Sequence, residues 1–261
     1  MVVISPQKWQ LKTHRNCWQS KQILKKIFYI LCFLSAAPAL SQRVVNHQSL
    51  YWIRYQNQLI FSPVFYWNNE IDNRRFFNPD VENQFIFHSR FHYKKGKWDI
   101  GTGLTLSWIY AQKPQNGYDH STAEVRPVAE VSFDQPLGKV SFQQRLRLDN
   151  RFVEENQDQS VWEDSFFVFR MRYRAQLKIP LKTNTENITI ISLRTAYEIM
   201  LNNKENTFDQ SRVYLTGEFY LTKQFSLETG YIYIYQQRFG LDEYFSRNVV
   251  RFSVLHRIQL N

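Results

Sequence analysis

Hydrophobic and polar side chains alternate with a period of two over most of the chain after residue 50. Residues 84–93 illustrate the pattern, because aromatic side chains occupy one parity and mostly polar side chains the other. The aromatic set is Phe85, Phe87, Phe91 and Tyr93, and the polar set is Gln84, His88, Arg90 and His92. Successive side chains of a β-strand point to opposite faces. The pattern therefore predicts a strand with one aromatic face and one polar face.

The same alternation recurs in nine further segments: 51–61, 98–110, 123–133, 140–152, 167–178, 189–199, 212–221, 225–236 and 250–260. A turn at Ser62-Pro63 leads into another predicted strand over residues 64–75. No segment carries the sustained i, i+3, i+4, i+7 apolar stripe of an amphipathic helix. The sequence therefore predicts an all-β protein with eleven candidate strands.

Strand length favours a membrane barrel over a soluble β-sandwich. The candidate strands run roughly 10–14 residues, enough to cross a bilayer at a tilt, whereas the usual strand of a globular protein has about 5–6. Short turns, such as residues 94–97, alternate with longer polar loops, such as 111–121. We therefore predict a closed antiparallel transmembrane β-barrel of 10–12 strands. An even count, 10 or 12, is expected because bacterial barrels of this kind have even strand numbers.

The first 41 residues resemble an export signal. Six basic residues and no acid precede an apolar run, Ile27 to Leu34, and a small-x-small end at Ala39-Leu40-Ser41. The run is too short for a membrane anchor, and Cys32 lacks the small residues that precede a lipidated cysteine. We expect a cleaved signal peptide, 1–41, and a mature domain, 42–261.

Removing this segment changes the charge and the cysteine content. The full chain has formal net charge +10, but residues 42–261 hold 27 basic and 23 acidic residues and no cysteine. The expected mature protein therefore needs no disulfide, and nucleic acid is not an expected partner.

Several short motifs occur in a characteristic order. They are Trp52, Glu70 with Arg74, the run 208–212, Gly230-Tyr231, the run 235–238 and the closing run 248–252. With these motifs the chain resembles the bacterial outer-membrane proteins catalogued as domain of unknown function 2490. The resemblance implies a β-barrel in the outer membrane of a Gram-negative bacterium, with no assigned activity. Outer-membrane lipid and the barrel-assembly machinery are the partners expected of such a protein.

The polar positions of the predicted strands would face the lumen of the barrel, and many of them are arginine. The lumen-facing candidates are Arg90, Arg126, Glu130, Arg145, Arg147, Asp149, Arg170, Arg172, Arg174, Arg194, Glu198, Arg212, Glu218 and Arg251. Rings of arginine favour anions, so one hypothesis is a porin-like barrel that passes or binds small polar or anionic solutes. The alternative is a structural, envelope-integrity barrel whose lumen is closed by cross-strand salt bridges. A lipid- or peptide-processing enzyme at the rim is a third, less favoured class.

No catalytic, cofactor or metal site is predicted. His88 and His92 lie four residues apart on one strand, about 13 Å, too far to share one metal ion. The triplets Asp72-Asn73-Arg74 and Asp149-Asn150-Arg151 are predicted to end strands and to pair across the mouth of the barrel, with asparagine in a turn.

Overall fold

The protein is described from a computed structural model. The structure describes residues 44–260 except 111, 117–120, 156–160, 162, 186–187, 205 and 239–241. The predicted signal peptide, residues 1–41, lies outside the described residues.

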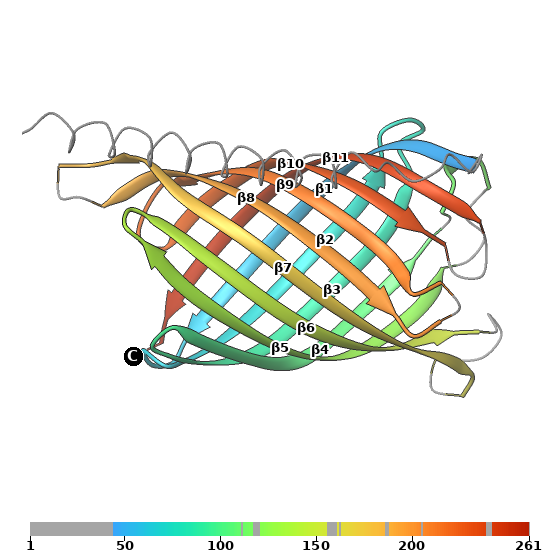
Figure 1. Cartoon of the computed structure of the whole chain (residues 1–261), viewed down its shortest axis with the longest axis horizontal. Coiled ribbons are helices and arrows are strands. Elements are labelled where there is room, and N and C mark those ends of the chain that lie inside the picture. Colours follow the sequence, from blue (N-terminus) through green and yellow to red (C-terminus); the bar gives the residue numbers. More distant parts are fainter. Residues whose placement is uncertain are drawn as a thin grey trace, which may run out of the picture. The chain divides into compact units, whose positions relative to one another are not determined.

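Eleven strands form one closed barrel in which neighbours along the chain pair with each other (Figure 1). They are β1 Val44–Ile60, β2 Phe65–Phe76, β3 Glu82–Lys95, β4 Trp98–Ile109, β5 Thr122–Leu137, β6 Val140–Glu154, β7 Ser165–Thr183, β8 Thr189–Asn202, β9 Phe208–Tyr220, β10 Phe225–Gln237 and β11 Glu243–Gln259. The closed all-β barrel predicted from the alternation is confirmed. Each of the eleven predicted segments overlaps one strand.

The prediction of an even strand number is wrong, and so is the prediction of a fully antiparallel barrel. β1 closes the barrel by pairing with β11 in parallel, with Ile53 opposite Phe252. All other neighbours are antiparallel, as in β1 with β2. An odd number of alternating strands leaves the first and last pointing the same way, so the closing pair must be parallel. Alternation assigns a side chain to a face, but it does not reveal which strands meet at the seam.

The two ends of the barrel differ in their connections. The turn end carries the tight connections, such as residues 96–97 between β3 and β4. Gly96 and Gly138 adopt φ of 60° and 63° in two of these turns, a conformation that glycine adopts without a steric penalty. The loop end carries longer connections, including the β4–β5 loop with a 3₁₀ turn at Pro114–Asn116.

The barrel is apolar outside and polar inside. Large hydrophobic side chains are about half exposed on the outer face, including Trp98, Tyr197, Leu215 and Phe252 at 50–54%. Charged side chains of the opposite parity are buried, including Asp72, Glu198 and Glu218 at 0–1%. Among the described residues, no helix is long and apolar enough to cross a membrane.

Candidate functional site

Three cavities follow one another inside the barrel. The loop-end cavity has a volume of about 440 Å³ and the turn-end cavity about 630 Å³. A middle cavity of about 260 Å³ shares Arg54, Arg145 and Arg251 with the first and Gln56, Gln143 and Arg194 with the second. Arg174 lines all three. The interior space is therefore divided into adjacent cavities that share lining residues, rather than forming one wide channel.

Arginine dominates the loop-end cavity. Among the described residues, fourteen arginines line it, against three carboxylates. Nine predicted lumen residues lie on its wall: Arg90, Arg126, Arg145, Arg147, Arg170, Arg172, Arg174, Arg212 and Arg251. Glu130 lines the middle cavity, Glu218 the turn-end cavity and Arg194 both. Asp149 and Glu198, at 1% and 0% exposure, lie behind the arginines as their ion-pair partners.

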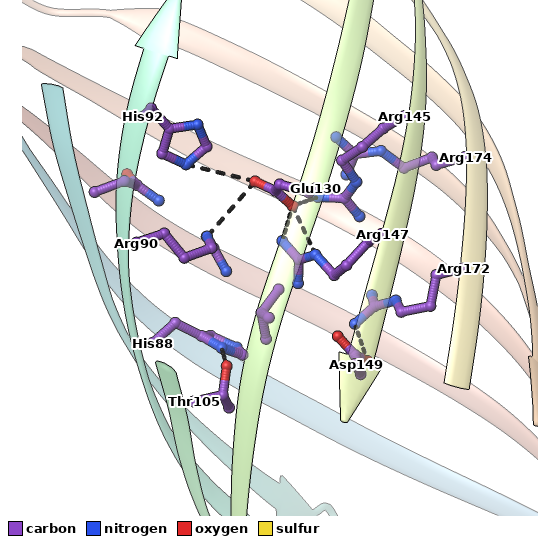
Figure 2. A network of polar contacts seen from close by, with 12 residues as sticks. His88, Arg90, His92, Thr105, Glu130, Arg145, Arg147, Asp149, Arg172 and Arg174 are labelled. Atoms are coloured by element: carbon purple, nitrogen blue, oxygen red, sulfur yellow. Dashed lines mark hydrogen bonds and ion pairs between the residues drawn. The ribbon is translucent and has the colours of Figure 1, made fainter. Parts of the chain in front are cut away.

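Glu130 of β5 is the centre of one charge network (Figure 2). Its Oε2 accepts hydrogen bonds from Arg147, whose Nε and Nη2 are both 2.6 Å away. Arg90 and His92 of β3 approach the other carboxylate oxygen at 3.7 and 3.5 Å, and Arg145 lies 3.7 Å from Oε2. Because β3 and β6 both reach this carboxylate of β5, the network joins three strands.

Glycine makes room for one member of this network. Gly101 faces His92 in the β3–β4 register, and a Cβ there would lie 2.6 Å from His92 Cε1. His92 is thereby held against Asp99 at 2.9 Å while its other nitrogen faces Glu130. A larger residue at position 101 would displace the imidazole ring.

Glu198 of β8 is the centre of a second network. It accepts hydrogen bonds from Arg172 of β7 at 3.1 Å and from the Tyr214 hydroxyl at 2.8 Å. Arg145 of β6 also reaches it at 2.8 Å. Asp149 in turn binds Arg170, and its nearest contact with Arg172 is 3.6 Å. These carboxylates compensate charge on the side of the interior formed by β6–β8.

The two Asp-Asn-Arg triplets do not form the predicted rim motif. Both lie within strands β2 and β6, where asparagine occupies no turn. Asp72 pairs with Arg74 at 3.0 Å and with Arg54, whereas Arg151 pairs with Glu124 rather than with Asp149. The triplets lie inside strands because β2 continues to Phe76 and β6 to Glu154, past the predicted strand ends at residues 75 and 152.

Five further charged residues of the interior, on β1, β2 and the start of β11, were not among the lumen residues predicted from the sequence. They are Arg54, Glu70, Asp72, Arg74 and Arg247, all buried or half-buried in the interior. Three of them, Glu70, Asp72 and Arg74, could have been predicted. Together with Asn68 they occupy alternate positions of β2, a polar pattern that indicates one face of the strand. Arg247 was missed because β11 begins at Glu243, seven residues before the predicted start.

Trp52 of β1 lies among arginines in the loop-end cavity. The guanidinium carbon of Arg74 lies 3.9 Å from its ring centroid, and that of Arg212 lies 5.5 Å away. Arg74 is directly opposite Trp52 in the β1–β2 register. Arg212 belongs to β9, which β10 and β11 separate from β1. Two residues from well-separated strands therefore meet at one indole ring.

A separate ion pair lies at the loop-end rim. Arg75 and Asp80 are 2.7 Å apart, and the Tyr51 hydroxyl donates a hydrogen bond to the same carboxylate. The hydrogen bonds from Arg75 and Tyr51 lower the pKa of Asp80 below its ordinary value. Asp80 is largely exposed and belongs to the loop rather than to the interior.

Comparison with known proteins identifies a family to which the chain is similar. A family model described as a protein of unknown function (DUF2490) matches residues 50–245, from within β1 to within β11. The matched range includes Trp52, Glu70, Arg74 and Arg212. No curated protein and no solved structure matches the chain.

Proposed function

Because the chain belongs to the DUF2490 family of proteins of unknown function, we propose its role from the barrel itself: a bacterial outer-membrane protein that admits small anionic solutes to its interior. The apolar outer face supports the membrane location, since an exposed belt such as Ile100, Leu104 and Trp108 is unfavourable in water. A closed barrel also satisfies the backbone hydrogen bonds of every strand, as the hydrocarbon region requires. Insertion then depends on the barrel-assembly machinery.

The lining of the loop-end cavity carries the functional proposal. Fourteen arginines surround a space of about 440 Å³, and three of them, Arg174, Arg212 and Arg247, have no carboxylate oxygen within 4.0 Å among the described residues. Uncompensated guanidinium groups at a wet surface attract anions. Because neighbouring cavities share lining residues, anions attracted into one cavity would move along the barrel to the next.

A structural barrel with a closed lumen is the second candidate. The middle cavity, about 260 Å³, is the smallest of the three. Ion pairs such as Arg90 with Glu130 and Arg145 with Glu198 connect strands that are not neighbours. Cross-links of this kind narrow the lumen and stabilise the wall.

Electrical recording in planar lipid bilayers separates the two candidates. Protein purified in detergent, and shown to be folded by heat-modifiable migration, is added to a bilayer in a KCl gradient. An anion-passing barrel gives single-channel steps and a reversal potential displaced toward that of chloride. A folded protein without steps contradicts passage and favours the closed barrel.

A further inference from the structure

We propose that Trp52, Arg74 and Arg212 form a binding site for phosphate or a phosphate monoester inside the barrel. The inference rests on the proposed access of anions to the interior, and it adds a location and a ligand class. All three residues line the loop-end cavity. Arg247, on the wall of the same cavity, adds a further positive charge.

The local charge is positive because few carboxylates are available. Asp72 is shared by Arg74 and Arg54, with both ion pairs at 3.0 Å. Arg212 instead binds neutral groups, the Gln210 side-chain oxygen at 2.5 Å and the Tyr214 hydroxyl at 3.4 Å. No carboxylate oxygen among the described residues lies within 4.0 Å of its guanidinium. An anion entering here would supply the missing countercharge.

Arg247 is held in place without being neutralised. Its three guanidinium nitrogens donate to the side-chain oxygens of Gln48, Gln236 and Gln112 at 2.7–2.9 Å. Arg74 and Arg212 line the same cavity and carry charges of the same sign. Three guanidinium groups of like charge are thus oriented within one region without an equal number of carboxylates.

Trp52 adds an observation that is independent of the charges. It is 3% exposed, and its indole nitrogen is buried without a hydrogen-bond partner among the described residues. A buried donor without an acceptor is unfavourable, so an acceptor beside it would be stabilising. Arg74 stacks on the ring and Arg212 lies near it, so an acceptor beside the indole N–H would contact positively charged neighbours.

Phosphate fits this arrangement by its chemistry. Guanidinium groups bind phosphate oxygens in a bidentate manner, and a tetrahedral anion accepts hydrogen bonds from several directions at once. Trp52 and Arg74 belong to the neighbouring strands β1 and β2, whereas Arg212 comes from β9, which β10 and β11 separate from β1. Leu50, Ile234 and Phe245 line the same cavity and offer apolar contact to the carbon group of a monoester.

Isothermal titration calorimetry at low ionic strength tests the site with inorganic phosphate and methyl phosphate as probes. We expect saturable binding of one or both by the detergent-purified protein. Arg212→Gln should weaken binding about tenfold or more, since hydrogen bonds to charged groups are among the strongest. Trp52→Phe should weaken binding and remove the phosphate-dependent change in tryptophan fluorescence.

Arg75→Gln is the matched control, because Arg75 follows Arg74 but pairs with exposed Asp80. It removes the same charge and should leave phosphate affinity unchanged. Folded wild-type protein that binds neither probe overturns the site, as does unchanged affinity in both Arg212→Gln and Trp52→Phe. Chloride conductance without phosphate binding contradicts this site alone, whereas phosphate binding without conductance contradicts passage alone.

Discussion

Arg145 of β6 donates a hydrogen bond of 2.8 Å to Glu198 of β8, so this ion pair spans the intervening strand β7. Glu198 is completely buried and also binds Arg172. Removing one partner of a buried ion pair costs about 3–5 kcal/mol, because the remaining charge stays buried. We expect Glu198→Gln to lower the free energy of unfolding by about 3 kcal/mol or more. This change in the free energy of unfolding is measured by urea unfolding in detergent micelles, with circular dichroism as the signal.

Asp80→Asn is the control for this prediction. It also removes a carboxylate bound to arginine, but Asp80 is exposed in the β2–β3 loop, where solvent screens the pair. The urea concentration at the midpoint of unfolding should hardly change. Equal midpoints for Glu198→Gln and wild type would show that the ion pair across β7 does not stabilise the barrel.

Arg174 is the residue at which the proposed anion preference is best tested. It lines all three cavities, and its hydrogen bond goes to Gln143 at 3.5 Å rather than to a carboxylate. Arg174→Gln therefore removes a positive charge without leaving an ion-pair partner behind, in contrast to a change at Arg172. We expect a smaller anion preference, measured as a reversal potential nearer zero in a KCl gradient. An unchanged potential in an otherwise conducting variant would contradict a role for Arg174.

Gly101→Ala should destabilise the barrel. The new Cβ would lie 2.6 Å from the His92 ring and would displace it from Asp99 and Glu130. Overpacking of this kind costs about 1–3 kcal/mol. Gly217→Ala is the matched control, because its Cβ would meet Phe219 at 3.5 Å, an ordinary contact. A similar effect of both changes on the urea midpoint would argue against the special role of position 101.

The strands were predictable because each one separates an apolar face from a polar face, and this alternation is written directly in the sequence. The parity of Arg170, Arg172 and Arg174 therefore predicted their location. The direction of closure was not predictable in this way, since Ile53 and Phe252 lie on the apolar face of their strands whichever strands pair. Only the three-dimensional register makes them neighbours.

The sequence indicates which residues face the interior, but it does not indicate which of them contact one another. Arg145 lies 3.7 Å from Glu130 on the neighbouring strand β5, but its hydrogen bond of 2.8 Å goes to Glu198 two strands away. The meeting of Trp52 with Arg212 likewise depends on barrel curvature, because the two residues are 160 positions apart in the chain. Long arginine side chains span the lumen, so their partners depend on geometry that periodicity does not encode.

The parallel seam between β1 and β11 can be tested by cross-linking. Ile53 and Phe252 are register partners on the outer face, and paired strands lie about 4.8 Å apart, within reach of a disulfide. Ile53→Cys combined with Phe252→Cys should form a disulfide under mild oxidation, seen as altered migration on a non-reducing gel. Ile53→Cys with Leu260→Cys is the control, because Leu260 lies eight residues farther along. Cross-linking of the control pair alone would exclude this register.

Residues on the outer face test the proposed membrane location. Both cysteines of the sequence, Cys17 and Cys32, lie in the predicted signal segment, so single cysteines can be introduced with these two changed to serine. Tyr197 is 50% exposed on β8, and Lys223 is exposed in the β9–β10 turn. If the barrel spans the membrane as proposed, a membrane-impermeant maleimide should label Tyr197→Cys poorly in lipid vesicles, because hydrocarbon would cover the outer face and keep the reagent away. Lys223→Cys should be labelled in vesicles when the turn end faces outward, or after vesicle permeabilisation when it faces inward. Equal, rapid labelling of both positions in intact lipid vesicles would show that Tyr197 faces water, and the proposed membrane span would then fail.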